Sequence, residues 1–551
     1  MSLSLYITHV EGQGFLTAKG KILVNDRGEK VILRGMGLGG WMLQEGYMLR
    51  VGAIGQQYRI KEEIALLAGR EKTVQFYKRW LDNFIRKTDI DSMAAWGFNS
   101  VRVPMHYHLF TQAADYPAKV ENVWYPEGFA LLDSLLSWCK ANKMYLILDL
   151  HAAPGGQGND LNISDRDPSK PSLWESELNQ RKTIALWKKL AERYANEPWI
   201  GGYDIINEPN WGFEDSTDRR GIAEKTNAPL RKLMKDITKA IRSVDKRHII
   251  IIEGNGFGNN YRGMLPPWDN NMVLSFHKYW NHTTEASIQG HLALREKYNI
   301  PLWMGESGEN SNPWFTETIR LVETHDIGWA WWPLKKMGNN NPLEIAVPAG
   351  YQRMLDHWAG KGPRPTEKEA QDALDELLRA VRCENNIYHR DVTDAMFRQV
   401  YSNEAIPFKQ HVIGDSLMTV IPAVEYDLGG QGVAYFDKDS ASTPGIKTLG
   451  NKGHVCRNDG VDITGGIGEY HVFSIEDGEW LQYTVDIKKE GEYKILTDST
   501  GAGQISLYDD GKPILHPTTG VHLSAGRHRL KVVADKGGFL FYALRLIREG
   551  L

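Results

Sequence analysis

Short runs of apolar residues recur through the first 335 residues of the chain. Apolar and polar positions do not alternate strictly in them, which is typical of strands buried on both faces, as in parallel sheets. Eight runs are present: VILRGMG (31–37), SVRVPM (100–105), YLILDLH (145–151), GGYDIIN (201–207), HIIIIEG (248–254), MVLSFHKY (272–279), PLWMGES (301–307) and GWAWWPL (328–334). We therefore predict eight parallel strands.

Helical periodicity fills the segments between these runs. It is clearest in 127–142, where apolar residues recur on one face, and it returns in 60–96, 174–195, 228–244, 284–298 and 313–325. Strands alternating with helices predict an α/β fold, a (β/α)8 TIM barrel, which typically needs about 250 residues. The segment 14–31, with a turn near 26–28, predicts a hairpin that covers the bottom of the barrel.

The pattern changes after Gly362 and Pro363. Residues 368–385 predict one more helix. From about residue 411, short strands with Gly-rich turns replace helices, which is typical of an all-β, jelly-roll-like sandwich. We predict a catalytic barrel over 1–410 and a sandwich over 411–551. No low-complexity linker separates them, so we expect the two to dock.

Composition narrows the function classes. A formal charge of −4 with no basic stripe argues against nucleic acid as a partner. The 18 Trp and 23 Tyr suit a large core, and their rings also suit stacking on sugars. Three scattered cysteines predict neither a disulfide framework nor a metal site. No apolar stretch reaches the roughly 18 residues of a membrane span, and the first residues do not form a signal-peptide pattern.

Polar and ionisable residues gather where the predicted strands end. Chemistry in such a barrel collects at these carboxyl ends, and buried polar groups are costly unless they are paired. The residues concerned are Arg102, His151, Asn207, Glu208, His277, Tyr279, Glu306 and Trp332. Two of them, Glu208 and Glu306, are carboxylates that can face one another across a cleft. Facing carboxylates are the minimal equipment for cleaving a glycosidic bond.

This ordered set resembles glycoside hydrolase family 5, whose members are retaining (β/α)8 glycosidases. The resemblance covers roughly residues 14–360 and rests on the whole series from Arg102 to Trp332 rather than on Asn207-Glu208-Pro209 alone. It implies that Glu208 is the acid/base and Glu306 the nucleophile. A retaining mechanism predicts carboxyl groups about 5–5.5 Å apart. No metal or other cofactor is needed for this chemistry.

The remaining residues then have expected roles at the substrate. Glu306 must stay ionised, so Arg102 and Tyr279 are expected to donate hydrogen bonds to its oxygens. Asn207 is expected to bind the sugar 2-hydroxyl, and His151 and His277 to orient the carboxylates and bind hydroxyls. Trp332, rather than Trp329 or Trp331, is expected to form the floor beneath the sugar ring. Trp41, in a predicted loop, is a candidate platform for an outer sugar.

The expected substrate is a β-linked glucan oligo- or polysaccharide. Endo-β-1,4-glucanase activity is the leading prediction. The segments 35–47 and 148–157 also resemble subgroups that include exo-acting β-1,3-glucanases. Mannanase and glycosylceramidase activities stay open, because one barrel can host all of them. A polymeric substrate predicts a secreted or periplasmic protein, and we expect a monomer. The competing hypothesis is a non-catalytic glycan-binding protein.

Residues from about 420 to 548 resemble carbohydrate-binding module family 6, most clearly in GGQGVAYFD, NDGVDI and GEWLQYTV. The resemblance implies glycan binding, with Tyr435, Phe436 and Trp480 as candidates, and a structural calcium ion. The chain departs from the pattern at Pro422 and Val424, where acidic residues are usual, which weakens the calcium expectation. The sandwich is therefore expected either to bind sugar or only to pack on the barrel.

Overall fold

The eight predicted strands form one closed, parallel barrel. The computed structural model describes residues 14–52, 54–114, 122–215, 217–279, 281–414, 416–439 and 452–549. The barrel strands are β4 (Arg34–Gly37), β5 (Ser100–His106), β6 (Tyr145–Ala152), β7 (Ile200–Asp204), β8 (Ile250–Glu253), β9 (Met272–Lys278), β10 (Leu302–Gly308) and β11 (Gly328–Trp332). Every residue of β5, β6, β9 and β10 is buried, as expected for strands covered on both faces.

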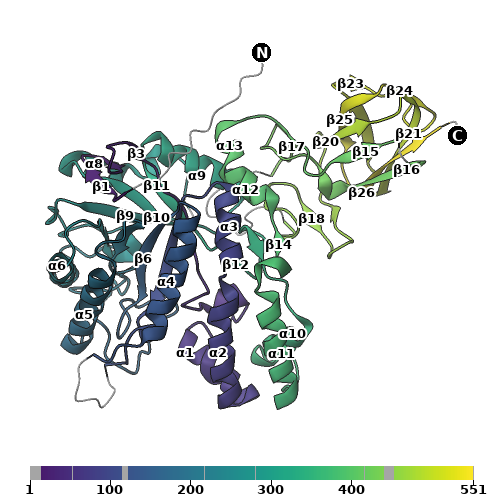
Figure 1. Cartoon of the computed structure of the whole chain (residues 1–551). Helices are drawn as coiled ribbons and strands as arrows, with labels where there is room; N and C mark the ends of the chain where they lie inside the picture. The colour runs from purple at the N-terminus through teal and green to yellow at the C-terminus, as the bar shows by residue number, and fades with distance from the viewer. Residues whose placement is uncertain are drawn as a thin grey trace.

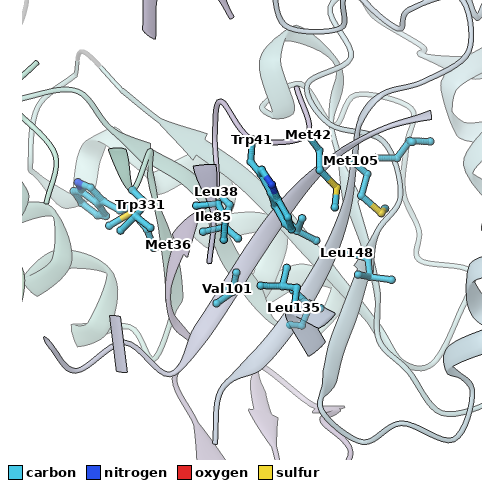
Figure 2. Packing of buried hydrophobic residues seen from close by; sticks show 14 of the residues in the cluster. Met36, Leu38, Trp41, Met42, Ile85, Val101, Met105, Leu135, Leu148 and Trp331 are labelled. Atoms are coloured by element: carbon cyan, nitrogen blue, oxygen red, sulfur yellow. The ribbon is translucent and has the colours of Figure 1, made fainter. Parts of the chain in front are cut away.

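Helices cover the outside of the barrel (Figure 1). They are α1 (Gln57–Ala68), α2 (Arg70–Phe84), α3 (Lys87–Trp96), α4 (Pro126–Ala141), α5 (Glu177–Tyr194), α6 (Ala228–Arg242), α8 (Gln289–Tyr298) and α9 (Asn312–Thr324). The short α7 (Asn255–Gly258) instead follows β8 at the carboxyl end of the barrel. Their apolar faces and the outward side chains of the strands form one large core. Figure 2 shows part of it, in which Val101 of β5, Leu148 of β6 and Leu135 of α4 are buried together.

The predicted hairpin lies at the bottom of the barrel. It consists of β1 (Thr17–Lys19), β2 (Ile22–Val24) and β3 (Lys30–Val31), paired antiparallel. Leu16 and Leu23 share a small core with inward side chains of the barrel, among them Ile147 and Trp303. The hairpin therefore closes the end of the barrel opposite the carboxyl ends of its strands.

Four helices follow the barrel: α10 (Ala349–Trp358), α11 (Glu367–Ala380), α12 (Arg390–Met396) and α13 (Arg398–Tyr401). The helix predicted over 368–385 is α11, which ends earlier because a short 3-10 turn follows at Cys383–Asn385. Thr366 and Glu369 form a capping box at its start, which satisfies backbone N–H groups there.

The C-terminal region consists of two mostly antiparallel sheets. The central strands are β20 (Trp480–Ile487), β25 (Gly526–Lys536) and β22 (Gln504–Asp509) in one sheet, and β26 (Phe539–Arg548) and β21 (Gly491–Gly501) in the other. Tyr483 of β20 and Leu544 of β26 belong to one shared core, so the sheets pack face to face. Figure 1 shows these sheets (yellow) beside α12 and α13.

The main core of the barrel and the core of the sandwich are separate, which supports the predicted division of the chain. The larger core draws its buried residues from Met36 to Val400, and the other from Ile413 to Leu546. We therefore propose a catalytic unit over 1–410 and a sandwich over 411–551. None of the helices in the described residues is long and apolar enough to cross a membrane.

Candidate active site

A cavity of about 660 Å³ opens at the carboxyl ends of the barrel strands. Six of the nine predicted site residues line it: His151, Glu208, His277, Tyr279, Glu306 and Trp332. Arg102 and Asn207 lie directly behind these residues and are bonded to them. Side chains from strands far apart in the sequence therefore meet at one place.

Glu306, near the end of β10, is held by two donors. Arg102 donates from Nη1 to Oε2 at 2.8 Å, and the Tyr279 hydroxyl donates to Oε1 at 2.8 Å. These are the two donors expected from the sequence. Both carboxylate oxygens are thus held in place, one by a charge-assisted hydrogen bond from a guanidinium.

Arg102 is completely buried and sits on a layer of acidic groups. It donates to Asp204 at 2.9 and 3.0 Å and to Glu253 at 3.2 Å, and its Nη1 lies 3.3 Å from Asp149. Burial alone would lower the pKa of Arg102, but Asp149, Asp204 and Glu306 raise it well above its usual value. The guanidinium is therefore a permanent cation behind the site.

Glu208 follows β7 with a left-handed backbone, at a φ of 41°. Its N–H donates to Glu253 Oε2 at 2.7 Å, and its Oε1 is bonded to His277 Nδ1 at 2.7 Å. The other ring nitrogen, Nε2, lies 3.1 Å from Glu253 Oε1. Glu253 thus supports both the backbone of Glu208 and the imidazole that holds its carboxyl group.

The carboxylates around His277 determine its charge. Burial alone would lower the pKa of His277, but Glu253, Glu306 and Glu208 raise it well above its usual value. Burial would conversely raise the pKa of Glu253, whereas His277 and Arg102 lower it to about 2. An imidazolium donates from both nitrogens, so His277 can orient Glu208 on one side while Glu253 anchors it on the other.

The two candidate carboxylates approach closely. One oxygen of Glu208, one oxygen of Glu306 and one nitrogen of His277 all lie within 4.8 Å of one another. Three such donors could in principle hold a metal ion. However, both ring nitrogens of His277 are already bonded to carboxylates, at 2.7 and 3.1 Å, so neither is free to ligate a metal ion. The two carboxylates therefore face one another in the same cavity.

Asn207 and His151 form a second chain of hydrogen bonds. Asn207 Oδ1 accepts from Arg102 at 2.7 Å, and its Nδ2 lies 3.3 Å from His151 Nε2. His151 Nδ1 lies 2.7 Å from Asp149 Oδ2. This pattern assigns the proton to Nδ1 and leaves Nε2 as an acceptor, which fixes the direction in which the Asn207 amide points.

Trp332 forms one wall of the cavity. Its ring is stacked on His151 with centroids 5.0 Å apart, and its indole N–H donates to the Tyr47 hydroxyl at 3.0 Å. Gly37 makes room for it, since a Cβ there would come 2.5 Å from the Trp332 ring. Trp329 and Trp331 point the other way into the outer core, as the alternation along the strand predicts.

The structure does not place Trp41 at the cavity, contrary to the expectation of a sugar platform. Its side chain is 1% exposed, and its indole N–H donates to the Leu81 carbonyl at 2.8 Å. Figure 2 shows it packed with core residues such as Met42. The loop after β4 folds inward here because its apolar side chains gain more from burial than from lining a wet cleft.

Sequence reasoning missed Glu45, which lines the same cavity. Its side chain is buried, and none of the described residues gives its carboxyl group a hydrogen bond or ion pair. Burial and the nearby Glu306 raise the pKa of Glu45 well above its usual value. The available signal was an acidic residue soon after the first barrel strand, within an otherwise apolar loop.

Two loops are in close contact beside the cavity. Ile163 lines the cavity, whereas Ser164 and Asp165 line a second cavity of about 750 Å³ behind it. Asp165 accepts a hydrogen bond from the Tyr58 backbone at 2.9 Å. A Cβ on Gly55 would come within 1.9 Å of the Asn162 side chain, so the two loops touch directly.

A (β/α)8 barrel with two carboxylates facing one cavity is typical of glycoside hydrolases. The family model for cellulase (glycosyl hydrolase family 5) matches residues 63–338. A β-xylosidase of Phanerodontia chrysosporium is 33% identical over 387 residues, which cover 64% of this chain and 77% of that protein. The chain belongs to glycosyl hydrolase family 5 and is a glycoside hydrolase.

Other relatives carry different names. Endoglucanase C of Acetivibrio thermocellus is 25% identical over 324 residues, covering 48% of this chain and 87% of that protein. A probable glucan 1,3-β-glucosidase A of Aspergillus clavatus is 30% identical over 187 residues, covering 32% of this chain and 41% of that protein. The family is therefore common to these relatives, whereas the activity differs among them.

Proposed function

We propose that the protein is a retaining β-glycosidase that works through a covalent glycosyl-enzyme. Glu306 is the nucleophile and Glu208 the acid/base. The observation that carries this proposal is the approach of their carboxylate oxygens within 4.8 Å, with Glu306 clamped by Arg102 and Tyr279. This close approach favours a retaining mechanism, in which the carboxyl groups are about 5–5.5 Å apart, over an inverting one, in which they are about 6.5–9.5 Å apart.

The reaction then has two balanced steps. In the first, Glu306 attacks the anomeric carbon while Glu208 gives its proton to the departing glycosidic oxygen, which breaks the glycosidic bond. In the second, Glu208 takes a proton from water, and the resulting oxygen nucleophile displaces Glu306. Asn207, fixed by Arg102 and His151, binds the sugar 2-hydroxyl. Trp332 supports the sugar ring from one side.

We propose a β-linked glucan as the substrate, cleaved from its end. We infer this mode from the contact between the loops at Gly55 and Asn162, next to Ile163 of the cavity lining, where we propose that the passage of a long chain is obstructed. The similarity to a protein named β-xylosidase and to proteins named glucan 1,3-β-glucosidase also supports it. Endo-β-1,4-glucanase activity is the second candidate, favoured by the relatives named endoglucanase.

Hydrolysis assays test this proposal. The substrates are the 4-nitrophenyl β-glucoside, β-xyloside and β-cellobioside, with barley β-glucan, laminarin, carboxymethylcellulose and mannan. Wild type should release the β-anomer first, as seen by proton NMR, and Glu306→Ala should lose activity. Early release of monosaccharide without a fall in viscosity supports attack from the end, whereas a rapid fall in viscosity supports the endo mode. Equal behaviour of wild type and Glu306→Ala would contradict catalysis at this site.

We propose that the C-terminal sheets are a carbohydrate-binding-module-like sandwich, that the protein acts as a secreted or periplasmic monomer, and that any calcium ion is structural. Phe436 is 37% exposed and offers a ring to a sugar, whereas Tyr435 is buried. Retardation of wild type, but not Phe436→Ala, in gels containing β-glucan would support sugar binding by the sandwich.

A further inference from the structure

One loop of the C-terminal sandwich is bonded to the barrel beside the catalytic cavity. We call residues 455–459 the docking loop. Asn458 in it is 4% exposed and makes hydrogen bonds from both backbone and side chain. Its N–H donates to Asp391 Oδ2 at 2.8 Å, and its carbonyl accepts from the Asn312 N–H at 2.8 Å. Its Nδ2 donates to the Asn310 carbonyl at 2.8 Å and to Asn312 Oδ1 at 3.1 Å.

These partners belong to the segment that follows the candidate nucleophile. Asn310 and Asn312 come four and six residues after Glu306 and are buried at 1% and 4% exposure. Between them and Glu306 lies Glu309, which lines the cavity and pairs with Lys336 at 2.5 Å. The docking loop therefore holds the segment whose other end forms the cavity wall.

A second hydrogen bond joins the docking loop to the segment that follows Lys336. Asn339, three residues after Lys336, donates from Nδ2 to the Arg457 carbonyl at 3.1 Å. Lys336 and Glu309 thus each stand next to a segment bonded to the docking loop. One loop of the sandwich fixes both halves of the ion pair that borders the cavity.

Arg457 anchors the docking loop to the sandwich. The Arg457 guanidinium lies 3.6 Å from the centre of the Tyr426 ring and 2.9 Å from Asp459. Arg457 is 1% exposed, and it also donates to the Asp427 carbonyl at 3.2 Å. A loop anchored in this way can transmit the position of the sandwich to the barrel.

We propose that the sandwich is part of the scaffold of the active site and that Asn458 is a positioning residue. It acts through residues 308–312 on Glu309 and so shapes the wall against which the glycan lies. This inference rests on the proposed function, because the wall matters only if the cavity binds a glycan. Glu306 is held independently by Arg102 and Tyr279, so the effect falls on binding more than on the chemical steps.

The test compares Asn458→Ala with a matched control, Tyr493→Phe. The Tyr493 hydroxyl donates to the Lys489 carbonyl within the sandwich, so this variant removes a hydrogen bond remote from the barrel. On the aryl β-glycoside that wild type cleaves best, Asn458→Ala should raise KM about tenfold and change kcat less than about threefold. Tyr493→Phe should leave both constants unchanged. Equal KM values for the two variants would overturn the proposal.

A double-mutant cycle tests the route. If Asn458 acts through Glu309, Asn458→Ala combined with Glu309→Gln should raise KM no further than the larger single effect. Additive effects would overturn that route.

A third readout needs no turnover. Amide hydrogen exchange over 308–312 should be faster in Asn458→Ala than in wild type or Tyr493→Phe. Unchanged exchange would overturn the proposal even in an inactive protein, whereas absent hydrolysis with faster exchange would overturn only the proposed function.

Discussion

At the scale of single residues, buried charge fixes the geometry of the site. Arg102 and His277 are buried cations, and each is shared between a candidate catalytic carboxylate and Glu253. Such a network is stable only while every member is present, since removing one partner leaves a buried charge uncompensated. Glu253 is therefore as necessary to the geometry as the residues that touch the substrate.

The variant Glu253→Gln tests this role. Glu253 raises the pKa of His277, so a neutral side chain at 253 lowers that pKa. The imidazolium is then lost at a lower pH, and the alkaline limb of the activity profile should move to lower pH. The measurement is kcat/KM against pH for wild type and variant. An alkaline limb that does not move would show that His277 does not act as a cation.

Much of this site could be predicted from the polar residues at the ends of the predicted strands. Arg102 and Tyr279 were expected to bind Glu306 because a carboxylate that must stay ionised needs donors, and both do. Whether a loop side chain is buried in the core or faces the cavity could not be predicted in the same way. Trp41 and Glu45 are four residues apart in one loop, yet the aromatic ring lies in the core and the carboxyl group lines the cavity.

At the scale of elements, apolar runs identified all eight barrel strands, because strands buried on both faces have little freedom in composition. The contacts between loops were not predictable. The bond from Tyr58 to Asp165 joins residues 107 positions apart, and only the folded barrel brings them together. The proposed attack from the end of the chain draws on such contacts.

One turn between elements contributes to the free energy of unfolding in a way that depends on pH. Asp245, between α6 and β8, accepts from Tyr203 and is bonded to His248. Burial alone would raise the pKa of Asp245, but His248, Arg247 and Tyr203 lower it from 3.8 to about 2. A lowered pKa means that the folded state gains stability from the ionised carboxylate above about pH 4.

Asp245→Asn should therefore cost about 2 kcal/mol of unfolding free energy at pH 7. The difference from wild type should shrink as the pH falls from 4 toward 2, because wild type then loses the same contribution. Urea unfolding across this range measures it. A difference that persists undiminished at low pH would mean that the charge at position 245 is not its source.

At the scale of the whole molecule, two cores are joined by buried hydrogen bonds rather than by a free tether. The absence of a low-complexity linker predicted docking. The residues that form the contact could not be predicted, since Asn458 is hydrogen-bonded to Asn310, which lies 148 residues away in the sequence. A buried polar contact of this kind is costly to break, so we expect the two units to unfold together.

Differential scanning calorimetry tests this coupling. Wild type should show one unfolding transition, and Asn458→Ala should separate it into two or lower the temperature of the sandwich alone. Tyr493→Phe, which lowers stability without touching the contact, should keep a single transition. Two transitions in wild type would mean that the docking loop does not couple the units.

The central claim is that Glu306 forms an ester with the sugar while Glu208 supplies the proton. Incubation with a 2-deoxy-2-fluoro-β-glycosyl fluoride, followed by intact mass and peptide mapping, tests it most directly, because the fluorine slows the second step and the intermediate accumulates. We predict one added sugar, attached to Glu306, and no adduct in Glu306→Ala. An adduct on another residue, or none while the fluoride is consumed with inversion, would contradict the claim.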